Sequence, residues 1–166
     1  MTSLRLKVRK LTEDHHMLIH FLLGVIVALF SQRFFPDANL QRLLIAGFLG
    51  SFIPDIDHIF FLFMYGKNSK YAKHSKFILS HDGFKAWVNF CKLNHKKNTQ
   101  LFSHNIIFAI SAVLISLWFL VERDSISMFV FMFAWFMHYI FDIFEDYIFF
   151  GKLNSNWTLK FKETFK

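Results

Sequence analysis

The sequence predicts an all-α integral membrane protein, a bundle of about four transmembrane helices with a loop or helix at the cytoplasmic membrane surface. Of the 166 residues, 54% are hydrophobic and 25 are phenylalanine. They lie in long blocks rather than on alternating faces, which indicates hydrocarbon around the chain. Each block should be helical, because a bilayer offers the backbone no hydrogen-bonding partner. We expect residues 1–166 to form a single membrane-embedded domain.

Four apolar blocks have roughly the length of a bilayer-crossing helix, about 17–25 residues. They cover about 17–35, 40–65, 105–121 and 128–150. Pro36 and Asp37 mark the first hairpin turn, and Arg123 and Asp124 mark the second. The first block also fits the apolar region of a signal peptide, but no small-residue cleavage site follows it and His20 lies within it. We therefore prefer an uncleaved membrane anchor.

The net charge of +7 is distributed in the way that orients a multi-pass membrane protein. Sixteen of the 19 lysine and arginine residues lie before the first block, between the second and third blocks, or near the C-terminus. This pattern predicts an inner (plasma) membrane protein with both termini and the loop 66–100 in the cytoplasm. It argues against a nucleic-acid partner and favours contact of the basic segments with anionic membrane lipids.

The loop 66–100 is expected to contain a helix of its own. Phe84, Trp87, Val88 and Cys91 recur at helical spacing. Such a helix either lies in the membrane interface or packs on the bundle, and the spacing does not separate the two. Cys91 is the only cysteine, so no intramolecular disulfide forms.

Ionisable residues inside an apolar block are the most informative feature, because a charge near the bilayer centre costs about 2.5–3.5 kcal/mol on insertion scales. The second block contains Pro54-Asp55-Ile56-Asp57-His58. Asp55 and His58 share a helix face, whereas Asp57 points elsewhere, where it would bind a second ion or orient His58. The alternative is that two shorter helices meet at Pro54 and leave the acids in water.

The other blocks place ionisable residues in the same, cytoplasmic half of the expected bilayer. His138 and Asp142 are four residues apart on one face of the fourth block, and Glu145 continues that face. In the first block, His20 lies four residues before Gly24, whose small size allows a close helix approach. The four blocks are therefore expected to bring their polar residues together.

A metal ion is the simplest use for such a set, because a cation and its ligands neutralise one another. The candidate ligands are His20, Asp55, His58, His104, His138 and Asp142. Mixed histidine and carboxylate ligands suit one or two divalent ions, zinc first, with manganese and iron as alternatives. A bound metal lowers the pKa of coordinated water toward about 7, and Asp57 or Glu145 would act as general base. Whether His16 or His95 joins the site is left open.

In the order and approximate spacing of these motifs, the chain resembles the predicted membrane-bound metal-dependent hydrolases, a family that includes the LexA-regulated inner-membrane proteins of bacteria. The matching elements are His20…Gly24, the PDxDH motif at 54–58, His95-Lys96 followed by Ser103-His104-Asn105, and His138…Asp142. Lys96 stands for an arginine of the family pattern, and Glu145 stands for its final threonine. The resemblance implies metal-dependent hydrolysis. The HxxxD helix also resembles the zinc-holding helices of phospholipase C and S1-type nucleases, which points to a phosphoester or lipid-like substrate.

Two other functions are compatible with these residues. A non-enzymatic metal-binding or metal-transporting protein should have polar residues in both halves of the bilayer, whereas the outer halves of these blocks are almost purely apolar. A structural or regulatory membrane protein would pair its His and Asp groups with one another and bind no metal. We expect a hydrolase whose small-molecule or lipid substrate enters at the cytoplasmic leaflet, where Lys96 and Lys97 could meet a phosphate.

Overall fold

All the regular structure in the described residues, 3–98, 100–122 and 125–158, is helical in this computed structural model. The elements are α1 (Ser3–Phe34), α2 (Leu40–Phe60), the π-helical turn η1 (Phe61–Tyr65), α3 (Lys70–His81), α4 (Gly83–Asn94), the 3-10 turn η2 (His95–Lys97), α5 (Ile106–Glu122), α6 (Ile126–Phe150) and the 3-10 turn η3 (Ser155–Thr158). The predicted all-α class is confirmed. The predicted second hairpin turn and the basic residues beyond 158 lie outside the described residues.

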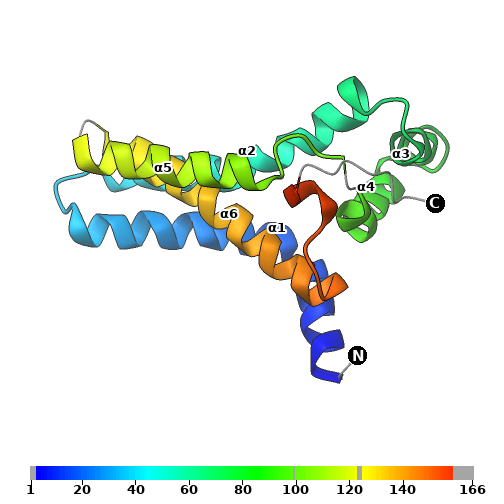
Figure 1. Ribbon diagram of the computed structural model, residues 1–166, viewed down its shortest axis with the longest axis horizontal. Helices are drawn as coiled ribbons and strands as arrows, with labels where there is room; N and C mark the ends of the chain where they lie inside the picture. Colours follow the sequence, from blue (N-terminus) through cyan, green and yellow to red (C-terminus); the bar gives the residue numbers. More distant parts are fainter. Residues whose placement is uncertain (1–2, 99, 123–124, 159–166) are drawn as a thin grey trace.

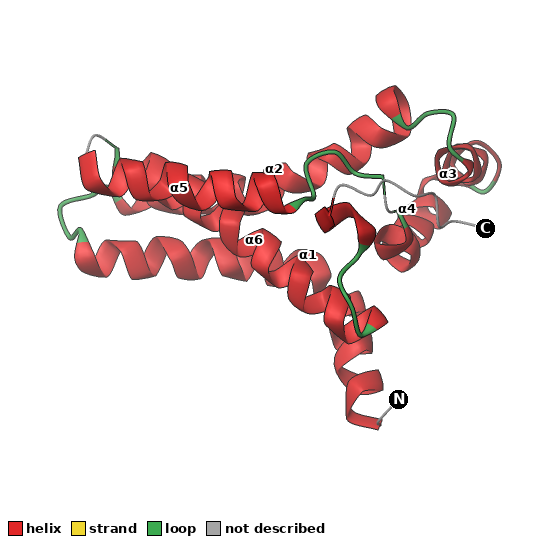
Figure 2. Ribbon diagram, in the orientation of Figure 1, coloured by secondary structure: helices red, strands yellow, loops and turns green. Residues whose placement is uncertain are grey.

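The helices α1, α2, α5 and α6 run alongside one another and form the bundle (Figure 1). Helix α6 packs against each of the other three. The α1–α2 connection lies at one end of the bundle, and the short α3–α4 hairpin lies at the other (Figure 2).

Three helices are long and apolar enough to cross a membrane, namely Leu6–Phe34, Leu40–Tyr65 and Ile126–Phe149. The fourth expected span corresponds to α5, which has 17 residues and lies at the short end of crossing lengths. Large apolar side chains face outward on these helices, as Phe30 does at 62% exposure and Leu114 at 59%. An apolar outer surface of this kind suits lipid rather than water.

The first helix begins earlier than the predicted span, at Ser3. His15 within it has non-helical backbone angles, φ −119° and ψ 16°. The turns before this residue bend away from the bundle (Figure 1). The kink therefore separates the basic N-terminal turns from the apolar part of α1.

Glycine allows close helix crossings at two points. A Cβ atom on Gly24 of α1 would overlap the backbone carbonyl of Gly47 in α2, and one on Gly47 would overlap the carbonyl of Gly24. A Cβ atom on Gly50 would overlap the carbonyl of Phe131 in α6. The predicted close approach at Gly24 is confirmed, and α2 is held tightly between α1 and α6.

Helix α2 continues through Pro54 and does not divide there. The alternative that two shorter helices meet at this residue is therefore wrong. Instead, the helix widens after Phe60 into the π-helical turn η1, whose end is closed by the Gly66 N–H donating to the Phe61 carbonyl. Turns of this kind often occur beside functional sites.

The helix expected in the loop 66–100 is present as α4. The loop also contains α3, which the spacing of apolar residues did not predict. Ser69 caps α3 by accepting from the Ala72 N–H, and the indole of Trp87 donates to Ser75 Oγ at 2.8 Å. These contacts hold α4 against α3, while Phe84 and Val88 stay exposed at 68% and 45%.

Candidate metal centre

All six predicted ligands lie in one cluster at the end of the bundle that faces the α3–α4 hairpin. They come from α1, α2, α6 and the segment before α5, and their ligand atoms fall into overlapping groups within 4.8 Å. The groups that contain only these six residues are His20–Asp55–His138, Asp55–His58–His104 and His104–His138–Asp142. The six side chains are buried or partly buried. The structure thus brings them together, and whether they bind metal stays a prediction.

His138 is oriented by the backbone of a neighbouring helix. Its Nδ1 donates to the Ser51 carbonyl at 2.8 Å, because a carbonyl oxygen only accepts. In the neutral ring this leaves the lone pair on Nε2, which lies 3.2 Å from Asp142 Oδ2 and 3.7 Å from Asp55 Oδ1. A histidine held by a carbonyl on one nitrogen and turned toward acids on the other has the usual environment of a metal ligand.

Asp142 lies at the centre of the cluster. Its Oδ2 is close to two imidazole nitrogens, His138 Nε2 at 3.2 Å and His104 Nε2 at 3.4 Å. Its Oδ1 accepts a hydrogen bond from Lys96 at 2.8 Å. Because one carboxylate reaches both histidines, Asp142 is placed to share an ion with either or to bridge two.

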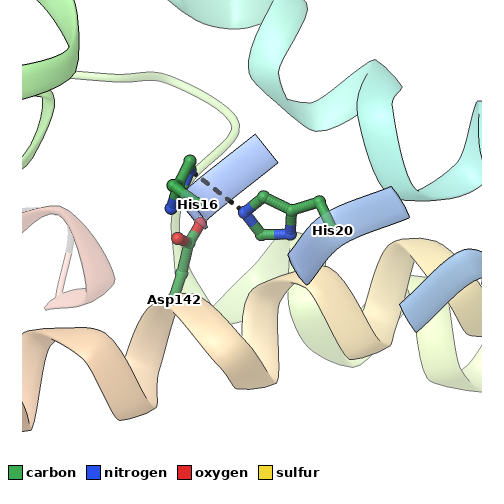
Figure 3. A group of neighbouring side chains, drawn as sticks. All are labelled: His16, His20 and Asp142. Atoms are coloured by element: carbon green, nitrogen blue, oxygen red, sulfur yellow. Dashed lines mark hydrogen bonds between the residues drawn. The ribbon is translucent and has the colours of Figure 1, made fainter. Parts of the chain in front are cut away.

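His20 and His16 approach Asp142 from α1, and all three side chains point toward one another (Figure 3). The ring of His20 stacks on that of His138, with centroids 3.9 Å apart. Its Nε2 lies 3.1 Å from His16 Nε2, so one of these two nitrogens carries the shared proton. The one-turn spacing of His16 and His20 was the sequence signal that His16 belongs here.

A further group of three, His16, His95 and Glu145, shares His16 with the group His16, His20 and Asp142. Oε2 of Glu145 lies 3.1 Å from His16 Nδ1 and 3.8 Å from His95 Nε2. His95 donates from Nδ1 to the Lys92 carbonyl at 2.8 Å, which leaves Nε2 to accept. Both histidines left open by the sequence therefore join the cluster.

Lys96 faces carboxylates rather than an open surface. Its Nζ lies 2.8 Å from Asp142 Oδ1, 3.1 Å from Glu145 Oε2 and 3.8 Å from Asp146 Oδ1. Burial alone would lower the pKa of Lys96, but these charges raise it above its ordinary value. Lys96 is thus held in an internal ion-pair network, and Lys97 donates to Asn94 Oδ1 at 2.9 Å; contact of either lysine with a phosphate stays a prediction.

The two predicted general bases lie outside the small cavity of the cluster. Asp57 accepts from Tyr65 on Oδ1, at 2.7 Å, and from the N–H and hydroxyl of Ser103 on Oδ2, at 2.8 and 2.9 Å. It thereby fixes the segment that carries His104. Glu145 is fully buried, and neither of its oxygens has a hydrogen-bond partner among the described residues.

A cavity of about 20 Å³ lies among the polar side chains, lined in part by Asp55, His58, His104 and Asp142. This volume accommodates a single ion or water, which needs at least about 10–15 Å³. Four buried atoms of the six candidate ligands, His20 Nδ1, Asp55 Oδ2, His104 Nε2 and His138 Nε2, make no hydrogen bond within the part of the chain that is described. Buried nitrogen and oxygen atoms without a hydrogen bond are suitable ligands for a divalent metal.

The charge of the site also favours a cation. Burial by itself would lower the pKa of His104, but the neighbouring carboxylates of Asp142 and Asp57 raise it to about 9. Such a shift indicates an excess of negative charge around the imidazole. An ion placed there would meet ligands that attract it.

Comparison with known proteins identifies the family. No curated protein and no solved structure matches the chain. The family model described as YdjM inner membrane protein matches residues 15–149, a range that contains α2, α5, most of α1 and α6, and every residue of the cluster. The chain therefore belongs to the YdjM inner membrane protein family.

Proposed function

We propose that this protein is a membrane-bound metal-dependent hydrolase that binds one or two divalent ions, zinc first, and acts on a phosphoester or lipid-like substrate. The observation that supports it most is that four buried atoms of the candidate ligands, from His20, Asp55, His104 and His138, make no hydrogen bond within the described residues, while Asp55 and His104 also line an ion-sized cavity. Buried polar atoms are normally hydrogen-bonded, so this concentration calls for a ligand. The alternative is a non-enzymatic cluster whose groups satisfy one another.

The residues divide into ligands and residues that position them. His20, Asp55, His58, His104, His138 and Asp142 would hold the metal, with Ser51 fixing the ring of His138. When bound, a divalent ion lowers the pKa of a coordinated water and polarises the ester oxygen. Glu145 lies outside the cavity and would accept the proton of the attacking water through His16, which lines the cavity and whose Nδ1 lies 3.1 Å from Glu145 Oε2. Asp57 would hold Ser103 and His104 in place.

The metal content of purified protein tests the site. We expect about one or two equivalents of a transition metal per chain, because the possible ligand groups overlap within one cluster. The double variant His138→Ala, Asp142→Ala should lose this metal. His81→Ala, an exposed histidine on α3, is the matched control and should keep it. If wild type and double variant are equally free of metal after purification without chelators, the cluster is a hydrogen-bonded network and the hydrolase proposal fails.

Two carboxamide variants separate the roles of the predicted bases. Glu145→Gln keeps the shape of the side chain but cannot take a proton, so we expect turnover to fall by about 10²–10⁴-fold with the metal retained. Asp57→Asn should lower metal affinity by about 10–100-fold, since it acts through the ring of His104. Steady-state kinetics at saturating metal, together with a metal titration, distinguishes the two. If Glu145→Gln lost the metal and Asp57→Asn kept it, the roles of general base and positioning residue would be reversed.

A further inference from the structure

A groove of about 550 Å³ opens beside the candidate metal centre, between α1 and the α3–α4 hairpin. This volume lies within the range of about 300–1,000 Å³ that is usual for small-molecule sites. Four of its lining residues also line the ion-sized cavity: His16, Asp55, His58 and His95. The groove and the centre therefore share a wall, so a molecule in the groove has one end at the metal ligands.

The rest of the groove is mainly apolar. Its apolar walls are formed by Met17, Leu18, Leu62, Tyr71, Trp87, Val88 and Cys91, and its remaining lining residues are Glu13, Asp14, His15 and Lys92. Leu62 and Tyr71 are buried, at 4% and 3% exposure, whereas Met17 and Val88 are exposed at 55% and 45%. The groove thus runs from a closed interior to an apolar rim, and the rim continues the outward-facing apolar surface of α1.

A weak ion pair joins the two sides of the groove. Lys92 Nζ on α4 lies 3.4 Å from Asp14 Oδ1 on α1, and the two side chains are 40% and 48% exposed. Exposed pairs of this length contribute little to stability, so Lys92 can exchange its partner for another anion. The groove therefore offers an apolar path, a cation and a metal-binding end.

We infer that this groove holds the acyl chain of an anionic lipid whose head group reaches the candidate metal centre. The inference rests on the proposed function for the chemistry at the head group and on the groove alone for the chain. An extended apolar peptide would bring backbone N–H and C=O groups that the apolar part of these walls cannot satisfy. A hydrocarbon chain has no such groups, and its burial along Met17, Trp87 and Val88 is favourable.

Cys91, the only cysteine of the chain, lines the groove and reports whether it is filled. Burial raises the pKa of its thiol, so alkylation is measured at alkaline pH. The protein is held in an amphipathic polymer, because detergent tails would compete for the groove. We expect hexadecyl phosphate to slow alkylation by about tenfold or more, since each buried methylene adds to binding. Ethyl phosphate and inorganic phosphate should leave the rate unchanged.

Two tryptophan substitutions test the path of the chain. Val88→Trp fills the groove from α4 and Met17→Trp fills it from α1, so each should abolish the difference in rate with and without hexadecyl phosphate. Leu114→Trp, on the outward face of α5, should keep that difference. The metal-site variant His138→Ala, Asp142→Ala should also keep most of it, so failure of the hydrolase proposal is distinguishable from failure of this one.

Three results would overturn the inference. Equal protection by ethyl phosphate or inorganic phosphate would mean that only an anion site exists. Protection by an apolar helical peptide but not by hexadecyl phosphate would assign the groove to a protein partner. Protection that survives both Val88→Trp and Met17→Trp would place the chain elsewhere.

Discussion

At the scale of single residues, two backbone carbonyls decide how the histidines face the centre. The Ser51 carbonyl accepts from His138 and the Lys92 carbonyl accepts from His95, so each ring turns its Nε2 toward an acid. Fixed tautomers reduce the entropy lost when a ligand binds. The site is therefore prepared by main-chain atoms as much as by the ionisable side chains.

Lys96 is the residue on which the buried acids depend. Its side chain is 10% exposed and lies within 4 Å of Asp142, Glu145 and Asp146. We expect Lys96→Met to destabilise the chelator-treated protein by about 3–5 kcal/mol, because the acids keep their charge without a partner. Thermal unfolding measures this, and Lys96→Arg, which retains the charge, should recover most of the loss. A Met variant as stable as wild type would show that the acids are neutral.

At the scale of elements, α6 and α2 together form most of the centre. Helix α6 contributes His138, Asp142 and Glu145 from one face, and α2 contributes Asp55 and His58. The two helices cross where Gly50 touches the backbone of α6. Their separation at this crossing therefore sets the distance between the two sets of side chains.

Gly50→Val tests this crossing. The added side chain would overlap the carbonyl of Phe131, so the helices must separate, at a cost of about 1–3 kcal/mol. We expect a lower unfolding midpoint together with weaker metal binding, because Asp55 and His138 move apart. Ile45→Val, at a site 51% exposed on the same helix, should change neither quantity. Full metal content in the Gly50 variant would show that the crossing does not control the centre.

At the scale of the whole molecule, the α3–α4 hairpin lies at one end of the bundle (Figure 1), and the polar centre and the groove lie beside it. The other end carries the turn between α1 and α2. The distribution of lysine and arginine predicts that the end with the centre faces the cytoplasm, and this orientation remains a proposal.

Site-directed labelling tests this orientation. In a Cys91→Ala background, Asp37→Cys lies in the turn between α1 and α2, and Asn68→Cys lies just before α3. An impermeant maleimide should label the first in intact cells and the second only after lysis, because the charge distribution predicts a cytoplasmic basic loop. Labelling with the opposite preference would invert the topology.

Much of the fold follows from the sequence because its rules are local. Block length predicts helices, and one-turn spacing places His138 with Asp142 on one face of α6. Small size at Gly24 predicts a close crossing, although its partner, Gly47, is not predictable from spacing. Helix α3 was missed, because Lys70–His81 is polar and lacks the apolar length that identifies the other helices.

By itself, the sequence determined the helical class, the apolar spans and the set of ionisable residues buried in them, because each depends on residues within a few turns of one another. Only the tertiary structure decided which of these residues meet. Lys96 and Asp142 are 46 positions apart, and His138 and Ser51 are 87 apart. No periodicity links such positions, and the packing of α6 between α1, α2 and the segment 95–105 brings them together. Asp57 likewise turns toward Ser103 because the chain returns there after the hairpin.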